Sequence, residues 1–171
     1  TTEETTEDAA ADETADAAGE TKDLSELKLA FIVGTENDAF YQSVEEGIVA
    51  QCEALGIPEP TLADQQLDGN ICSDLINNYV AAGYDAIALS ANAPAGTMPA
   101  IQAANTEGVE IFTFDCTLDD EYLDQYVAFV GSNNYAGGVT AAEYILENAP
   151  EGSTVGCITS ASAQSTQARQ A

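Results

Sequence analysis

Residues 27–43 read LKLAFIVGTENDAFYQS and hold both a strand and the start of a helix. The apolar run Leu29–Val33 predicts a strand that ends at Gly34, and a polar turn then places Phe40 and Tyr41 where a helix begins. In an open parallel α/β sheet, ligands bind outside the carboxyl ends of the strands, where such turns lie. The turn lacks both glycine-rich phosphate-binding patterns, so it offers amides, carboxylates and aromatic faces to a small, polar, uncharged molecule.

The rest of the chain continues this alternation of short apolar runs with segments of helical period. Such alternation is typical of β-α-β units, and it predicts an α/β fold with a doubly wound parallel sheet. The predicted strands are Leu29–Val33, Thr61–Ala63, Ala86–Leu89, Val109–Phe114, Tyr126–Val130 and Thr154–Thr159. The predicted helices are Phe40–Leu55, Gly69–Ala82, Thr97–Thr106 and Ala136–Asn148.

The charge of the chain restricts its partners. Thirty acidic residues stand against Lys22, Lys28 and Arg169, which gives a net charge of −27 over 171 residues. Nine of the acids fall in residues 1–23, which have no aromatic or branched aliphatic side chain and therefore predict a disordered acidic linker. A field of this sign repels nucleic acid and anionic lipid, so no nucleic-acid partner is expected. A salt-rich habitat is a further explanation of the acidity.

The residue types available for chemistry argue against a metal centre, a cofactor and an enzyme. The chain has no histidine, and its four cysteines form no C-x-x-C pair, so no zinc site is expected. The cysteines are interpreted mostly as small buried hydrophobic residues: Cys52, Cys72, Cys116 and Cys157. Asp119, Asp120, Glu121 and Asp124 form an acidic run that lacks EF-hand spacing, which favours a solvated loop over a calcium site. No pair of nucleophile and base can be assembled, so no catalytic residue is predicted.

Amides, hydroxyls and single carboxylates follow the predicted strands and should converge on one rim of the sheet. Carboxylates and amides bind vicinal hydroxyls through paired hydrogen bonds, and aromatic rings cover the apolar C–H face of a sugar. The sequence therefore predicts a cleft for a sugar or similar polyol. Its candidate ligand-binding residues are Asn37, Asp38, Phe40, Tyr41, Ser90, Asn92 and Asp115.

Several of these residues also have a purely structural interpretation. Asp38 could be only the cap of the helix that follows, and Phe40 and Tyr41 could fasten the start of that helix to the core. Ser90 and Asn92 are residue types that turns favour in any case.

Asp115 is the strongest candidate, because a carboxylate at the end of a buried apolar strand needs a partner. Cys116 lies beside it at the rim and is predicted to be inert, because no cation nearby in the sequence would lower the pKa of its thiol.

Four segments, in order, resemble the periplasmic sugar-binding proteins of ABC transporters: FIVGTENDAFYQSVEEGI, GYDAIALSANAP, GVEIFTFDCTLDD and AFVGSNNYAGGVTAAEYI. The resemblance is to the ribose- and galactose-binding type, which shares its fold with the effector domains of LacI-like repressors, and it covers residues 27–171. It implies the type I periplasmic binding protein fold, in which ligand is trapped between two α/β lobes. Residues 24–132 would form the N-terminal lobe, and 133–171 would contain the hinge and the start of a second lobe that is truncated here. The implied hinge residues are Ser132, Asn133 and Asn134.

The resemblance also implies roles for single residues. Asp38 and Phe40 match family residues that hydrogen-bond to the sugar and stack on it, and Tyr41 matches a second aromatic. Asp115 matches the Asp or Asn that grips sugar hydroxyls. Two family cations and one small hydroxyl residue are replaced, at or near Cys116, Gln167 and Gly34 respectively.

The implied function is that of a non-enzymatic, extracytoplasmic receptor that delivers a sugar or polyol to an ABC transporter permease by closing on its hinge. The acidic tail is then interpreted as a tether behind an N-terminal lipid anchor, as in a lipoprotein of the cell envelope. Two alternatives stay open. One is the ligand-sensing domain of a chemoreceptor or kinase. The other is a LacI-like regulator, which is disfavoured because an acidic tail stands where a basic helix-turn-helix is needed.

Overall fold

The computed structural model describes residues 22–159 and 164–171, and its centre is a parallel five-stranded sheet with the order β2-β1-β3-β4-β5. The strands are β1 (Leu29–Val33), β2 (Thr61–Asp64), β3 (Ala86–Leu89), β4 (Glu110–Phe114) and β5 (Ala128–Val130). The helices are α1 (Ala39–Leu55), α2 (Gly69–Ala81), α3 (Pro94–Thr106), α4 (Asn134–Asn148) and α5 (Gln164–Ala168). Two short 3-10 helices lie at Leu24–Glu26 and Asp120–Gln125. The predicted parallel α/β sheet is confirmed.

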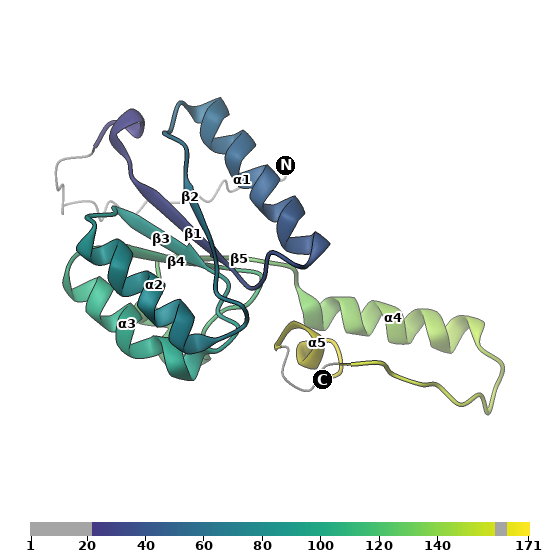
Figure 1. Ribbon diagram of the computed structural model, residues 1–171. Helices are drawn as coiled ribbons and strands as arrows, with labels where there is room; N and C mark the ends of the chain where they lie inside the picture. Colours follow the sequence, from purple (N-terminus) through teal and green to yellow (C-terminus); the bar gives the residue numbers. More distant parts are fainter. Residues whose placement is uncertain (1–21, 160–163) are drawn as a thin grey trace, which may run out of the picture.

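The main core lies between the sheet and the pair α2 and α3. Successive side chains of a strand point to opposite faces, and Ala30 and Ile32 of β1 belong to this core. Ile76 of α2 and Ile101 of α3 are fully buried against them. Figure 1 shows α2 and α3 side by side on this face of the sheet, with α1 on the other side and α4 and α5 extending away beyond β5.

The opposite face of the sheet is covered less completely. Phe31 and Phe112 on the strands and Val44 and Ile48 on α1 contribute to the lining of an apolar cavity of about 860 Å³. Parallel sheets are normally covered by helices on both faces. On this face α1 covers only part of the sheet, and the apolar side chains that it leaves uncovered line the cavity. The cavity runs from the amino ends of the strands, near Asp85, to their carboxyl ends.

Local sequence signals account for most of the helix boundaries. Asp38 caps α1, its Oδ1 accepting a hydrogen bond of 2.9 Å from the amide of Phe40, and Gly56 ends the helix with a φ of 71°. Helix α3 begins at Pro94, three residues before the predicted start at Thr97, because proline fits the first turn of a helix.

The predicted strand at Thr154–Thr159 is wrong. These residues form neither strand nor helix, and Ile158 is fully exposed. An extended segment becomes a strand only where a neighbouring strand takes up its backbone hydrogen bonds, and no described strand lies beside this one.

The cysteines and the termini complete the comparison with the sequence. Cys52, Cys72 and Cys116 are buried free thiols, as expected, whereas Cys157 is exposed. The predicted linker, residues 1–23, lies outside the described residues except for its last two. No helix in the described part of the chain is long and apolar enough to span a bilayer.

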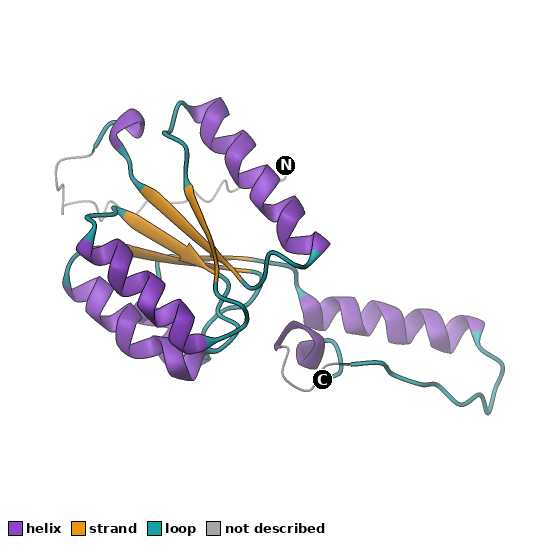
Figure 2. Cartoon of the chain, in the orientation of Figure 1, coloured by secondary structure: helices purple, strands orange, loops and turns teal. Residues whose placement is uncertain are grey.

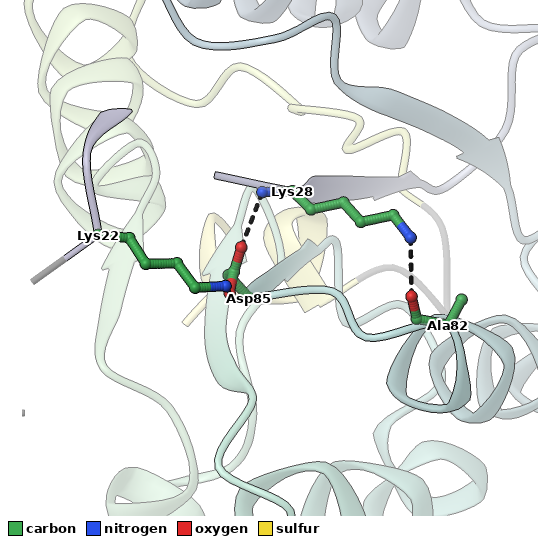
Figure 3. A network of polar contacts seen from close by, with 4 residues as sticks. All are labelled: Lys22, Lys28, Ala82 and Asp85. Atoms are coloured by element: carbon green, nitrogen blue, oxygen red, sulfur yellow. Dashed lines mark hydrogen bonds and ion pairs between the residues drawn. The ribbon is translucent and has the colours of Figure 1, made fainter. Parts of the chain in front are cut away.

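Lys22 and Lys28 both bond to the Asp85 carboxylate at the amino ends of the strands, Lys22 through its ammonium and Lys28 through its backbone amide (Figure 3). Lys22 forms an ion pair with Asp85, and the backbone amide of Lys28 donates to the other oxygen of Asp85 at 2.9 Å. The ammonium of Lys28 donates to the carbonyl of Ala82 at 2.7 Å and lies 4.4 Å from the centre of the Tyr84 ring. This cluster joins the start of β1 to the turn between α2 and β3.

The hydrogen bond from Lys22, followed by the amide of Lys28 and the charges of both lysines, lowers the pKa of Asp85. A lowered pKa in the folded state stabilises the fold above the unfolded value of about 4, and this contribution is lost as pH falls through the folded value. We expect Asp85→Asn to destabilise the protein by about 1 kcal/mol at pH 7 and by less as the pH falls. Urea unfolding from pH 7 to pH 3 measures this, with Asp74→Asn on α2 as control. An equal effect of Asp85→Asn at both pH values would contradict the ionic origin.

Candidate functional site

The topology gathers the carboxyl ends of β1, β3 and β4 at one rim. Strand β1 lies between β2 and β3, so the chain leaves it toward β2 and returns on its other side. Such a change of winding direction opens a crevice at the strand ends, which is where ligands bind in sheets of this kind. Figure 2 shows the connecting loops gathered at that end of the strands.

A hydrogen-bonded cluster fills this crevice and is centred on Tyr41. The Tyr41 hydroxyl donates to Asp115 Oδ2 at 2.8 Å and lies 3.1 Å from Ser90 Oγ. The amide nitrogen of Asn92 donates to the same hydroxyl at 3.3 Å. Four of the seven predicted ligand-binding residues therefore meet in one cluster, although they come from the ends of three different strands.

Tyr41 is inside the protein and Phe40 is not. Tyr41 is only 5% exposed, whereas 51% of Phe40 is accessible. The two rings meet edge to face with their centres 5.1 Å apart. Burial, opposed by hydrogen bonds from Ser90 and Asn92 and reinforced by the charge of Asp115, raises the pKa of Tyr41 to about 12, so its hydroxyl keeps its proton at neutral pH.

Gly34 makes room for the Tyr41 ring. A Cβ atom at residue 34 would lie 2.4 Å from the Tyr41 hydroxyl oxygen, 2.5 Å from its Cζ and 2.7 Å from Asn92 Oδ1. The backbone of Gly34 is not in the left-handed region, so the constraint here is space and not conformation.

Asp115 sits on an unusual backbone. Its φ is 59°, a left-handed conformation that aspartate tolerates at a cost of about 1 to 3 kcal/mol. The amide of Cys116 turns back to the carbonyl of Phe114 at 2.7 Å, and the amide of Asp115 donates to Val130 of the neighbouring strand at 3.0 Å. These two backbone bonds hold the carboxylate at the rim.

Gln65 is a member of the cluster that the candidate list lacked. It is fully buried, and its Nε2 donates to the Ser90 carbonyl at 2.7 Å and to Asn92 Oδ1 at 3.2 Å. Its own Oε1 has no partner among the described residues. The available signal was a polar residue directly after an apolar strand, but a loop glutamine is normally expected to face solvent.

Asn37 and Asp38 lie outside the cluster, in the exposed turn before α1. Asp38 forms the helix cap described above, and the backbone amide of Asn37 donates to Thr35 Oγ1 at 3.3 Å. Ligand contact by these two residues stays a prediction.

The predicted hinge residues connect β5 to α4. Asn133 caps α4, its Oδ1 accepting from the Ala136 amide at 3.0 Å, and Asn134 Oδ1 accepts from Arg169 Nε at 2.8 Å. Ser132 and Asn134 line the rim end of the apolar cavity together with Phe40 and Asp115. A hinge motion at these residues stays a prediction.

Cys116 is unsuited to nucleophilic chemistry. Its thiol is 3% exposed and donates to Asp115 Oδ2 at 3.4 Å. Burial, followed by the charge and hydrogen bond of Asp115, raises the pKa of Cys116 to about 11. Nor do the described residues contain any group of three acidic, cysteine or histidine side chains arranged to hold a metal ion.

Comparison with known proteins assigns the chain to a family. A model of the periplasmic binding protein domain matches residues 29–171. The chain belongs to the periplasmic binding protein family. It is 25% identical over 130 residues to the ribose import binding protein of Bacillus subtilis, which covers 76% of this chain and 41% of that protein.

Solved structures agree on the fold. The myo-inositol-binding protein of Caulobacter, solved with myo-inositol, has a TM-score of 0.75 at 17% identity over 89% of this chain and 51% of its own. A periplasmic ribose ABC transporter protein from Conexibacter woesei has a TM-score of 0.73 at 21% identity over 86% of this chain and 49% of its own. The type I periplasmic binding protein fold is therefore confirmed, and the chain spans between 41% and 51% of the length of these relatives.

The contact between Gly34 and Tyr41 can be tested by stability. We expect Gly34→Ala to destabilise the protein by about 1 to 3 kcal/mol, because the tyrosine ring has to move. Gly47→Ala is the matched control, since a Cβ there meets nothing within 4 Å and alanine favours the helix. In a Tyr41→Leu background the cost of Gly34→Ala should shrink. Urea unfolding measures all four variants, and equal behaviour of Gly34→Ala and Gly47→Ala would refute the constraint.

Thiol reactivity tests the assignment of the cysteines. At pH 8 we expect fast labelling of Cys157 alone by a disulfide reagent, because Cys116 has a pKa of about 11 and is buried. Mass spectrometry after a short reaction identifies the labelled residue, and Cys157→Ser should abolish the fast phase. Fast labelling of Cys116 in the folded protein would reopen a reactive role for it.

Proposed function

We propose that this chain is part of an extracytoplasmic solute receptor that captures a sugar or similar polyol at the carboxyl rim of its sheet and delivers it to an ABC transporter permease. The observation that carries the proposal is the Asp115 carboxylate, which is held at the rim by its neighbours and lines the same cavity as the exposed ring of Phe40. A carboxylate accepts hydrogen bonds from sugar hydroxyls, and an exposed ring covers a sugar's apolar face.

The chemistry of the cavity supports a ligand at the rim and not deeper. Along the sheet the lining residues are apolar, for example Phe31, Ala88 and Phe112. A polyol placed there would lose its hydrogen bonds to water without replacement, which costs several kcal/mol. Polar groups of the lining lie at the two ends: Asp85 and Glu110 at the amino ends of the strands, and Asp115, Ser132 and Asn134 at the rim. Asp85 is already engaged by Lys22 and the amide of Lys28, whereas the rim lies at the crevice.

The names of the relatives support the same class of ligand. The Bacillus subtilis relative is named for ribose, and the Caulobacter protein was solved with myo-inositol. Both compounds are small neutral polyols. The proposed mechanism is that ligand contacts to two lobes shift an open–closed equilibrium at residues 131–134, and the site performs no covalent chemistry.

A thermal-shift screen of the full-length protein tests the proposal. The panel contains D-ribose, myo-inositol, other monosaccharides, nucleosides and amino acids. A ligand at about 100 times its dissociation constant stabilises the fold by about 2.7 kcal/mol, which is a clear shift. We expect a polyol to give this shift and Asp115→Ala to abolish it.

Asp124→Ala is the matched control, because Asp124 is an exposed carboxylate on the 3-10 helix Asp120–Gln125, outside the cluster. It should leave the shift unchanged. A shift with amino acids or nucleosides alone would refute the polyol class but keep a receptor. A polyol shift that survives Asp115→Ala would refute the site.

A further inference from the structure

The hydrogen bonds of the Asp115 carboxylate are distributed very unevenly. Three groups donate to Oδ2: the Tyr41 hydroxyl at 2.8 Å, Ser90 Oγ at 3.3 Å and Cys116 Sγ at 3.4 Å. Oδ1 accepts a hydrogen bond from no donor within residues 22–159 and 164–171. A carboxylate oxygen has two lone pairs, so three donors leave Oδ2 no capacity for a ligand.

The strongest of these three bonds comes from a residue whose placement is tightly constrained. Tyr41 is almost fully buried, and the space for its ring exists because residue 34 has no side chain. Its hydroxyl is fixed from the other side by Asn92, and Asn92 is in turn held by Gln65. Among the acceptors within reach of this hydroxyl, Asp115 Oδ2 at 2.8 Å is nearer than Ser90 Oγ at 3.1 Å and Asn92 Oδ1 at 3.4 Å, so the proton points to Asp115.

We infer that Tyr41 is a positioning residue that sets the specificity of this site, by occupying Oδ2 of Asp115 so that only Oδ1 is presented to the ligand. The inference rests on the proposed function, in which Asp115 grips a hydroxyl group. A carboxylate with both oxygens free brackets two vicinal hydroxyls, whereas a carboxylate with one free oxygen accepts from a single hydroxyl. The site then depends strongly on that one hydroxyl of the polyol and tolerates changes at its neighbour.

Tyr41→Phe removes the bond and keeps the ring. The variant frees the carboxylate to turn and offer both oxygens, so two consequences are expected. Affinity for the polyol found in the screen falls by up to about ten-fold, because the carboxylate is no longer held in place before binding and has to be ordered by the ligand. The difference in affinity between that polyol and its single-deoxy analogues spreads from one position to two neighbouring positions.

Calorimetric titration of the full-length protein with the polyol and each of its mono-deoxy analogues measures both effects; for D-ribose the series includes 2-deoxy-D-ribose. Tyr84→Phe is the matched control, because the Tyr84 hydroxyl pairs with Thr61 at 2.7 Å, outside the cluster. Ser90→Ala is a second variant that weakens the hold on Oδ2 without touching the ring. It keeps the inference testable if Tyr41→Phe fails to fold. An unchanged deoxy profile in both variants would overturn the inference.

A ligand-free measurement separates this inference from the proposed function. Tyr41 has a pKa raised to about 12, in part through the negative charge of Asp115, so Asp115→Asn should lower it. Nuclear magnetic resonance of protein labelled with ¹³C at tyrosine Cζ follows this titration without any sugar. If no polyol binds but the Tyr41 pKa falls in Asp115→Asn, the proposed function fails while the contact stands. If the Tyr41 titration is the same in both proteins, the contact and the inference built on it are overturned.

Discussion

In a parallel sheet every strand starts at the same end, so each connection has to carry the chain back across the sheet before the next strand begins. That constraint brings residues 33–41, 90–92 and 114–116 to one rim, although up to 74 positions separate the hydrogen-bonded Tyr41 and Asp115. The change of winding direction between β1 and β3 then opens the crevice in which they meet. The topology of the sheet brings these three loops together, and the residues in the loops then form the cluster.

The charge of the chain makes the cations that it does have structurally important. With a net charge of −27, the acidic side chains repel one another in the folded state. A lysine that pairs with one of them reduces this repulsion, so it stabilises the fold more than it would in a protein with balanced charges. Lys22 and Lys28 both act at Asp85, at the amino ends of the strands. The carboxyl rim shows the opposite design, because Asp115 is held there by neutral donors: Tyr41, Ser90 and Cys116. Neutral donors orient a carboxylate and leave its negative charge in place.

The sequence predicted the elements of the sheet well, because apolar runs and helical periodicity report burial directly. The cap at Asp38 was one of the two interpretations that the sequence allowed, and the structure shows this cap at the start of α1. The strand predicted at Thr154–Thr159 failed because an apolar pattern describes a segment that suits a sheet but does not supply the neighbouring strand. Which elements exist is mostly local information, and which elements pair is not.

The same distinction between local and long-range information applies to the candidate site. The sequence located the rim loops, but it could not rank Phe40 and Tyr41, because adjacent residues on a helix point about 100° apart and only docking of the helix decides which one turns inward. Nor could it identify Gln65 as buried, since its burial depends on Ser90 and Asn92 from another strand. These are long-range contacts, and a single sequence does not record them.

Gly34, Tyr41 and Asp115 have to be understood together. A glycine at the end of a buried strand carries a cost in chain entropy, and a left-handed aspartate carries a cost in backbone strain. Neither cost is needed to close the sheet, since β1 would end as well with a small side chain and β4 with a glycine. The tyrosine ring explains both costs. It occupies the space over Gly34, and its hydroxyl reaches the carboxylate in the position that the left-handed backbone of Asp115 gives it. Two unfavourable local choices that serve the same hydrogen bond indicate that the orientation of this carboxylate, more than the stability of the sheet, is what the three residues maintain.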